Sequence, residues 1–311
     1  MTRLIADIGG TNARFALAEP GGVPADERHF LVRDHAEPAD AVEAYLGGRK
    51  VEEAVIAVAT PVESDAVRFT NSPWAFSIEG LRTRLGLRRL HVINDFVAQA
   101  LAMPHLAAAE REPLGGEAPV AQRAVGVLGP GTGLGVSALI PDSVGWTALP
   151  TEGGHVSFAP GSERERDLLA VLGERFGHVS NERLLSGQGL LNIAQGLAAV
   201  DGGRCPAATP EEVTDAARAG TCAACTEATA LFSALLGSAA GDLALMLGAR
   251  GGVYVAGGVC LRLGSLFDRT AFRRRFEAKG RMRAYLTPIP AWLVLRGDTG
   301  LLGAAHFRAS R

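Results

Sequence analysis

Two distant segments of the chain share one pattern of apolar residues and glycines. The segments are ADIGGTNARFAL, which starts at Ala6, and LGPGTGLGVSAL, which starts at Leu128. Each has a short apolar run, a glycine turn that contains a threonine, and a second run of similar length, which predicts strand, turn and strand. The repeat therefore predicts two related α/β halves. The length of 311 residues agrees with two domains at roughly 150 residues each.

The remaining apolar patterns complete the prediction of an α/β protein. Short apolar runs bounded by turn residues predict strands, and longer runs with helical periodicity predict helices. The predicted strands are 3–8, 12–17, 51–59, 90–93, 124–128, 134–140, 252–258 and 292–295. The predicted helices are 96–103, 163–176, 181–200, 222–248 and 267–283, with a last helix near the end of the chain. Residues 106–122, rich in glycine and proline, are predicted to link the two halves.

Charge composition limits the partners of the chain. The 31 Lys and Arg residues nearly balance the 33 Asp and Glu residues, and the net charge is -2. A chain with balanced charge lacks the excess of positive charge that is typical of proteins that bind nucleic acid. The basic segment Phe267–Arg283 has no interleaved aromatic platform and the total charge is balanced, so we interpret the segment as a solvated helix face rather than a nucleic-acid patch.

The apolar runs and the cysteine content predict a cytoplasmic protein without a membrane segment. Asp7 and a glycine pair interrupt the first apolar run too early for a secretion signal. Asp242 interrupts the longest apolar run, so no transmembrane helix is expected. Four cysteines in a chain of this length do not suggest an oxidised scaffold, which favours the cytoplasm.

Cys222 and Cys225 form a CxxC pair. Such a pair is typical of half a zinc site or of a redox pair. A structural zinc site needs a second pair of ligands, whereas Cys205 and Cys260 stand alone in the sequence and no histidine lies near them. We therefore expect two small residues at the start of a helix, and no metal.

Three glycine clusters follow predicted buried strands, at Gly9-Gly10, Gly129–Gly135 and Gly257-Gly258. Backbone amides in such turns can converge on an anion, and glycine allows close approach. Any one cluster alone is equally consistent with a tight hairpin turn; three together indicate a nucleotide with several phosphates. The chain has no GxxxxGK[ST] motif, and Gly129–Gly135 leads into a strand, unlike a dinucleotide fingerprint.

Polar residues stand at the ends of predicted strands or among glycines. Asn94-Asp95 follows a predicted strand and precedes a helix, where Asp95 would also serve as an N-cap. Glu152 and His155 flank two glycines, and Glu182 follows in a polar segment. Carboxylates, an amide and an imidazole can together satisfy sugar hydroxyls, each of which donates and accepts. Phosphorylation of a hydroxyl further needs one carboxylate to accept its proton.

The ordered motifs resemble the bacterial glucokinase family, in the type without a zinc-binding cysteine motif. The matching segments, which run from end to end of the chain, are ADIGGTNARFAL, TNSPWAFS, VINDFVAQALAMP, GPGTGLGV, LPTEGGHVSFAP, HVSNERLLSGQGL, GGVYVAGGV and DTGLLGAAH. The resemblance implies an actin/hexokinase-like (ribonuclease H-like) fold, a duplicated α/β unit with two domains and a central cleft. It implies a small domain of residues 1–105 and 296–311, and a large domain of residues 106–295.

The resemblance also implies the site residues. Asp95 is expected to be the general base, and Asn94, Glu152, His155 and Glu182 are expected to bind glucose. Magnesium would travel with ATP, with Asp7 near it through water. The residues expected to bind ATP are Ala6, Asp7, Ile8, Gly9, Gly10, Thr11, Gly131, Thr132, Gly133, Gly257 and Gly258.

By this resemblance the chain is an ATP-dependent kinase that converts D-glucose to glucose 6-phosphate at the entry to glycolysis, as a cytoplasmic homodimer. The residues leave open a kinase for fructose, mannose or an amino sugar, and a donor other than ATP. A sugar sensor without catalysis is disfavoured because no DNA-binding segment precedes the first strand. Two departures bear on the sugar pocket: Ser72-Pro73 occupies a variable loop, and Thr151 stands where the family often has glycine.

Overall fold

The computed structural model describes residues 2–69 and 72–309. Contacts divide the chain into two compact units. Unit 1 comprises Met1–Ala107, Ala148–Pro150 and Asp298–Arg311, and unit 2 comprises Ala108–Thr147 and Thr151–Gly297. Thr70 and Asn71, which open the segment TNSPWAFS, lie outside the described residues.

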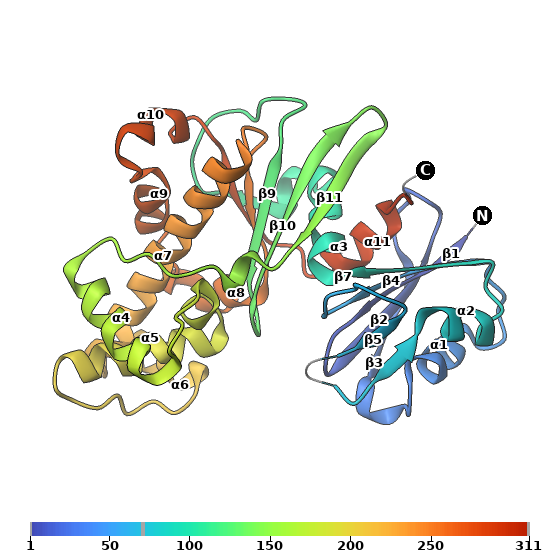
Figure 1. Cartoon of the computed structure of the whole chain (residues 1–311), viewed down its shortest axis with the longest axis horizontal. Coiled ribbons are helices and arrows are strands. Elements are labelled where there is room, and N and C mark those ends of the chain that lie inside the picture. Colours follow the sequence, from blue (N-terminus) through green and yellow to red (C-terminus); the bar gives the residue numbers. More distant parts are fainter. Residues whose placement is uncertain (1, 70–71, 310–311) are drawn as a thin grey trace. The chain divides into compact units, whose positions relative to one another are not determined.

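Unit 1 is built on a five-stranded mixed sheet with the order β3-β2-β1-β4-β7 (Figure 1). The strands are β1 (Arg3–Ile8), β2 (Asn12–Ala18), β3 (Ala25–Leu31), β4 (Glu53–Val58) and β7 (Arg89–Asn94). Strand β2 is antiparallel to β1 and β3, whereas β4 and β7 continue the sheet in parallel with β1. A separate hairpin pairs β5 (Ala66–Arg68) with β6 (Ala75–Ser77).

Helices cover both faces of this sheet, and successive residues of β1, which point to opposite faces, are buried on both. Leu4, Ala6 and Ile8 form a core with residues of α1 (Pro38–Leu46) and α2 (Ile78–Arg84). On the opposite face lie α3 (Asp95–Ala102) and α11 (Thr299–His306), which pack against each other. Arg3 donates hydrogen bonds to carbonyls at the end of α11, which ties the last helix to the first strand.

Unit 2 repeats the same strand arrangement. Its sheet has the order β11-β10-β9-β12-β13-β8, with β10 antiparallel to β9, and β12 and β13 in parallel with β9. The strands are β8 (Arg111–Pro113), β9 (Val125–Pro130), β10 (Leu134–Asp142), β11 (Gly145–Thr151), β12 (Val253–Val255) and β13 (Ala291–Val294). The shared arrangement confirms the predicted duplicated α/β fold, and β8 is an added antiparallel edge.

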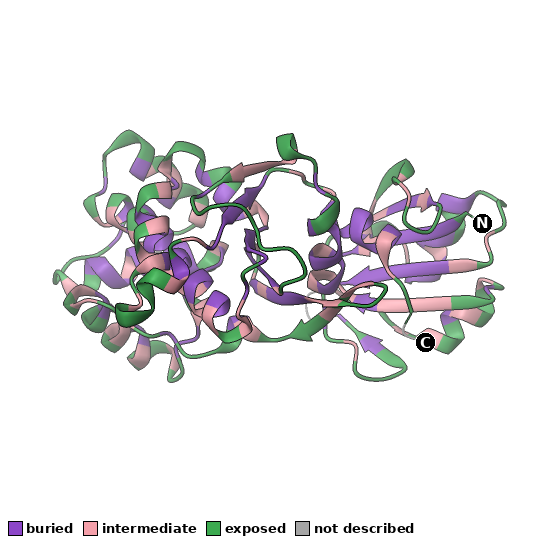
Figure 2. Cartoon of the chain, turned by 90° about the horizontal axis from the view of Figure 1, so that it is seen from above, coloured by how far each residue is buried: buried purple, intermediate pink, exposed green. Residues whose placement is uncertain are grey.

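Helices of unit 2 pack around one long apolar helix. They are α4 (Glu163–Phe176), α5 (Gly187–Val200), α6 (Pro210–Ala219), α7 (Ala223–Leu247), α8 (Gly258–Leu263), α9 (Arg269–Glu277) and α10 (Arg283–Leu286). Among the described residues, α7 alone is long and apolar enough to cross a membrane, with a mean hydropathy of 1.7. It packs against α5, α6, α9 and β9, so its composition suits the core of the unit, where Figure 2 shows buried helix and strand segments together.

Two predicted helices are shorter than expected. Residues 181–200 were predicted as one helix, but a 3-10 turn at Asn181–Arg183 precedes α5, which begins after Ser186. The Ser186 hydroxyl accepts the Gly189 amide as an N-cap, which stops the helix from extending backwards. The predicted helix 267–283 is also broken: α9 ends at Glu277, and Gly280 has a φ of +55°, which ordinary helix does not allow.

The predicted solvated face is present only in part, because Arg274, Arg281 and Arg283 are exposed whereas Arg275 and Lys279 are partly buried. Arg275 pairs with the buried Glu165 at 2.5 Å, and Lys279 pairs with Asp242 at 2.7 Å. The side chains of Arg275 and Lys279 are only 19% and 15% exposed. Arg275 therefore ties α9 to α4, and Lys279 ties the segment just after α9 to α7, because a partly buried cation needs a nearby carboxylate.

The cysteine pattern also differs from its prediction. Cys222 is the N-cap of α7, so the CxxC pair does open a helix as expected. Cys205, however, does not stand alone, because its sulfur lies 3.7 Å from that of Cys225. Sequence spacing did not indicate this contact, since it depends on how the loop after α5 returns to α7.

Two glycines allow α9 to approach α7 closely. A methyl group on Gly237 or Gly241 would overlap the carbonyl oxygen of Phe272 or Phe276, respectively. A rigid backbone atom cannot move aside as a flexible side chain can, so both positions need glycine despite its helix penalty.

We predict that Gly237→Ala lowers the free energy of unfolding by at least about 2 kcal/mol, the cost of overpacking a tight core. The matched control is Gly173→Ala in α4, where a methyl group would meet no atom within 4 Å. That control should stabilise the protein by up to about 1 kcal/mol, because alanine is the better helix former. Urea unfolding of both variants checks this, and equal midpoints would contradict the close packing of α7 on α9.

Candidate active site

Three parallel strands of unit 1 end side by side. Ile8 is opposite Val58, and Val58 is opposite Asn94, so β1, β4 and β7 finish in one row. In open α/β sheets, ligands bind beyond the carboxyl ends of parallel strands. Gly9-Gly10 and Asp95, which follow the first and last of these ends, therefore share one edge of the sheet.

The glycine turn after β1 is a tight hairpin with an exposed rim. The Gly9 amide donates to the Asn12 carbonyl at 2.9 Å, and the Thr11 carbonyl accepts the Val32 amide at 2.9 Å. Gly10 is partly exposed and Thr11 is exposed. Ala6 and Ile8, by contrast, have fully buried side chains within β1, so they contribute packing to the turn rather than side-chain contacts to a ligand.

Asp7 lies on the sheet face that α11 covers. Its side chain is 25% exposed, and the Arg14 guanidinium is 3.9 Å from its carboxylate. Gly300, in the first turn of α11, lacks a methyl group that would lie 2.6 Å from Asp7 Oδ2. Desolvation by burial raises the pKa of Asp7, and Arg14 opposes this shift.

The N-cap of α3 is Asn94 and not Asp95, which corrects the sequence interpretation. Asn94 Oδ1 accepts the amides of Phe96 and Val97 at 2.9 and 3.3 Å, and its amide nitrogen donates to the Thr60 carbonyl at 3.4 Å. Asp95 is instead the first residue of the helix. Asn94 therefore supplies the cap, and Asp95 holds its carboxylate at the positive end of the helix dipole.

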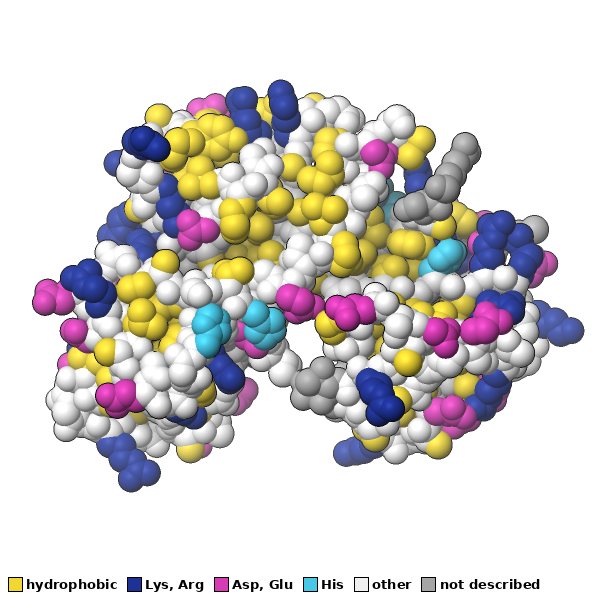
Figure 3. Space-filling model, in the orientation of Figure 1, with side chains coloured by type: hydrophobic (Ala, Val, Ile, Leu, Met, Phe, Trp, Pro, Cys, Tyr) yellow, Lys and Arg dark blue, Asp and Glu magenta, His cyan; other side chains and the backbone are white. Residues whose placement is uncertain are grey.

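In unit 2 the structure brings together three residues that the sequence separates. His155 Nδ1 is 3.9 Å from Glu182 Oε1, and His155 Nε2 is 3.9 Å from Glu152 Oε2. The side chains of Glu152 and His155 are 60% and 59% exposed, and Glu182 is 31% exposed. The imidazole thus lies between two carboxylates, and Figure 3 shows histidine and acidic side chains adjoining on this face of the unit.

Glycines position this cluster against the turn between β9 and β10. Glu182 Oε2 accepts the Leu134 amide at 2.9 Å, and a methyl group on Gly133 would overlap the same oxygen. Gly154 likewise leaves room for the Leu134 carbonyl. A carboxylate on a short 3-10 turn is therefore fixed by a backbone donor, which exposed side chains usually lack.

Thr151 has a structural role in this arrangement. Its hydroxyl donates to the Val136 carbonyl at 2.8 Å and accepts the Gly153 amide at 3.3 Å. These bonds fasten the end of β11 to β10 ahead of Glu152 and His155. The hydroxyl is thus engaged by the backbone of its own unit.

The glycine turn between β9 and β10 packs against Gly257 of the third glycine cluster. The Gly131 amide donates to the Gly133 carbonyl at 2.8 Å, and the Gly187 amide at the start of α5 donates to the Gly131 carbonyl at 2.9 Å. Gly257 has a φ of +84°, and a methyl group there would lie 2.5 Å from the Pro130 carbonyl oxygen. The start of α5, the turn and the loop before α8 are therefore packed together.

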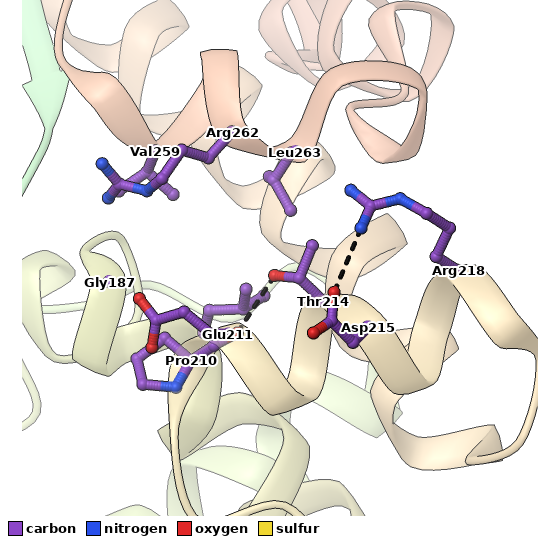
Figure 4. A pocket seen from close by; sticks show the side chains of 10 residues that line it. Gly187, Pro210, Glu211, Thr214, Asp215, Arg218, Val259, Arg262 and Leu263 are labelled. Atoms are coloured by element: carbon purple, nitrogen blue, oxygen red, sulfur yellow. Dashed lines mark hydrogen bonds and ion pairs between the residues drawn. The ribbon is translucent and has the colours of Figure 1, made fainter.

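A hollow of about 300 Å³ adjoins these loops in unit 2 (Figure 4). Helix α6 forms one wall, with Thr214 and an Asp215–Arg218 ion pair, and α8 forms the facing wall. The complete lining consists of Gly187, Leu190, Pro210, Glu211, Thr214, Asp215, Arg218, Val259, Arg262 and Leu263. Its volume is at the lower end of the roughly 300–1,000 Å³ typical of small-molecule sites.

Sequence reasoning missed the side chains of this hollow. Nothing in residues 210–219 indicated a site, and α6 itself was not predicted. The one available signal was position, because Val259 follows directly after Gly257-Gly258. Of the predicted site residues, those up to Asp95 belong to unit 1, and those from Gly131 onward belong to unit 2.

The chain is similar to known proteins over nearly its whole length. A family model described as Glucokinase matches residues 4–311. The chain is 50% identical to a glucokinase of Chromobacterium violaceum over 98% of this chain and 88% of that protein. It is 49% identical to a glucokinase of Aromatoleum aromaticum over 97% and 93%. A solved glucokinase from an Antarctic psychrotroph is 34% identical, with a TM-score of 0.90 and 98% of both chains covered.

We predict that Asp7→Asn raises the melting temperature at neutral pH. Folding raises the pKa of Asp7 above its unfolded-state value of about 4. The free energy of unfolding therefore falls as the pH rises from that unfolded-state pKa to the pKa of Asp7 in the folded protein. The gain from Asn should therefore be largest near pH 7 and shrink toward pH 4. Melting scans across this range check it, with the exposed Asp34→Asn as the control. A gain independent of pH would contradict the assigned cause.

Proposed function

The chain belongs to the glucokinase family, and from this premise we propose that it transfers the γ-phosphoryl group of ATP to the 6-hydroxyl of D-glucose. The products are glucose 6-phosphate and ADP. The observation that carries the proposal is the cluster of Glu152, His155 and Glu182, held by a backbone donor beside a glycine turn. It offers polar groups suited to a sugar next to amides suited to phosphate.

The three residues of this cluster have complementary hydrogen-bonding roles. Each sugar hydroxyl donates one hydrogen bond and accepts others, whereas an ionised carboxylate only accepts and a neutral imidazole does one of each. Glu152 and Glu182 would accept from hydroxyls, and His155 between them would donate to a sugar oxygen. Leu134 already supplies one donor to Glu182, so that carboxylate has a fixed orientation toward its ligand.

Asp95 is the proposed general base. It is the first residue of α3, and its carboxylate is a group that can accept a proton. In the proposed step the 6-hydroxyl proton passes to Asp95, the O6–phosphorus bond forms, and the bond from the γ-phosphorus to the oxygen of ADP breaks. Asn94 caps the same helix and so holds the base in position.

The glycine turns are the proposed phosphate contacts. Amides of Gly10 and Thr11 in unit 1, and of Thr132 and Gly133 in unit 2, are the candidate donors, because the Gly9 and Gly131 amides already donate within their own turns. The hollow between α6 and α8 would take the nucleoside, because Val259, which follows Gly257-Gly258 in the chain, lines it. Positioning and charge neutralisation account for most catalysis of phosphoryl transfer.

Asp7 fits a role near magnesium. Its carboxylate is an oxygen ligand of the kind that Mg²⁺ prefers, and desolvation raises its pKa, a cost that a nearby cation offsets. Magnesium bound to ATP would neutralise charge on the transferring phosphates. Asp7 would orient a water on that ion, and Gly300 would keep the carboxylate free of steric overlap.

The cellular setting is proposed from the family. We place the protein in the cytoplasm, as a homodimer that supplies glycolysis. We also propose that residues 1–105 with 296–311 and residues 106–295 act as its two domains.

The direct test is a coupled assay of the purified protein with glucose and Mg-ATP. Product should form in proportion to enzyme, and its phosphate should be on the 6-position by NMR. A panel with fructose, mannose and glucosamine should give the largest kcat/KM for glucose. A larger value for another hexose would replace the proposed substrate, and no product with any sugar would overturn the proposal of a kinase.

We predict that Asp95→Ala lowers kcat by about 10²–10⁴-fold, the usual contribution of a general base. The affinity for glucose should change far less, because the sugar keeps its other contacts. Stopped assays for kcat and calorimetry for glucose binding check the two quantities separately. A variant that keeps more than about a tenth of the turnover would remove Asp95 from this role.

We predict that Glu182→Gln mainly raises the KM for glucose, by about tenfold, the cost of roughly 1.4 kcal/mol in a hydrogen bond to a charged group. The isosteric amide keeps the shape beside Gly133 but weakens the acceptor. The control is Glu174→Gln on α4, outside the cluster. Steady-state kinetics check this, and an unchanged KM for glucose would exclude Glu182 from the sugar site.

A further inference from the structure

Three buried cysteines of unit 2, none of them among the proposed site residues, gather at the start of α7. Cys205 lies in the loop after α5, Cys222 caps α7, and Cys225 is in the first turn of that helix. Their sulfur atoms all lie within 4.8 Å of one another. The residues are 7%, 8% and 0% exposed, respectively, so the sulfurs converge inside the unit.

The spacing of the sulfurs suits a shared ligand. With zinc–sulfur bonds of about 2.3 Å, two sulfurs of a tetrahedral site are about 3.8 Å apart. The sulfurs of Cys205 and Cys225 are 3.7 Å apart without an ion. The Cys222 sulfur also accepts the Cys225 amide at 3.2 Å, a bond that fixes this sulfur at the N-cap of α7.

Neither simple core packing nor a disulfide accounts for the whole of this geometry. Three small apolar residues would fill the core equally well as alanine or valine, and would need no convergence of their tips. A disulfide would use two of the sulfurs and leave the third without a role. Thiophilic metal ions, by contrast, take three or four thiolates at once.

We propose that Cys205, Cys222 and Cys225 form a binding site for a thiophilic divalent cation, with Zn²⁺ as its best representative. Binding releases one proton from each thiol to solvent and involves no change of oxidation state. Cys205 also lines a hollow of about 580 Å³ together with Arg204, Pro206 and Gln195. This hollow offers an entry path, and a water within it would be the fourth ligand.

A bound ion would restrict the motion of α6. The chain between Cys205 and Cys222 contains α6, which lines the hollow proposed for the nucleoside. Linking the two ends of this segment through one ion restricts its motion, as closing a loop does. The ion would therefore stabilise α6 whether or not the protein phosphorylates glucose.

The test is the metal content of the whole protein. Protein prepared under reducing, anaerobic conditions, incubated with Zn²⁺ and desalted should keep about one equivalent per chain. Cys205→Ser, Cys222→Ser and Cys225→Ser should each lose at least about nine-tenths of it. The control is Cys260→Ala, which removes a buried cysteine of α8 outside the cluster and should retain the ion.

A second measurement needs no variant. Co²⁺ added to the wild-type protein should give the intense sulfur-to-cobalt absorption of thiolate ligands, which Zn²⁺ should abolish by displacement. Hydrogen exchange in α6 should be slower with Zn²⁺ than after chelation, by about threefold or more. Three results would each overturn the proposal. The wild-type protein could fail to retain Zn²⁺ or Co²⁺, all three serine variants could retain the ion as the wild type does, or the reduced preparation could contain a disulfide. None of these results depends on kinase activity.

Discussion

The bond from the Leu134 amide to Glu182 is the contact around which unit 2 arranges its polar cluster. It exists because Gly133 has no side chain where the carboxylate lies. The absence of a side chain at Gly133 thus lets the glycine turn contact an acidic residue 48 positions after Leu134. His155 then lies between Glu182 and Glu152, at 3.9 Å from each.

Glycines allow similarly close approach at candidate site residues of both units. Gly300 makes room for the Asp7 carboxylate, and Gly257 makes room for the Pro130 carbonyl. In each case a side chain or backbone atom of one element occupies the space that a methyl group would take on another. The large number of glycines, 39 in the chain, therefore reflects close approach in part and not looseness alone.

Sequence patterns predicted the parts of the fold that local rules govern. Buried parallel strands such as β4 and β9 are short apolar runs bounded by turn residues, which is a strong local signal. Strand β3 was missed because ADERHFL is mostly exposed at the sheet edge and has no apolar alternation. The break before α5 and the Asn94 cap were also missed, since nearby serine, asparagine and aspartate residues compete for capping positions.

The sequence proposed candidate site residues but not the contacts between them. Motif order singled out Glu152, His155 and Glu182, but neither their mutual distances nor the Leu134 donor follows from spacing along the chain. The cysteine cluster shows the same limit, because Cys205 meets Cys225 only through the return of a loop. Helix α6 has local helix signals, with Thr209 as its N-cap, Pro210 at its first position and Gly220 at its end, but none of them marks a ligand site.

The most direct test measures the affinity of the protein for glucose in the absence of nucleotide. It asks whether the contact between Glu182 and the Leu134 amide, for which Gly133 leaves room, keeps the sugar site in shape. Calorimetry would compare Gly133→Ala with Gly131→Ala, where a methyl group meets nothing closer than 4.0 Å. We expect a loss of at least about tenfold for the first variant, equivalent to roughly 1.4 kcal/mol, and a change within about twofold for the second. Equal affinities in the two variants would contradict this role of the contact.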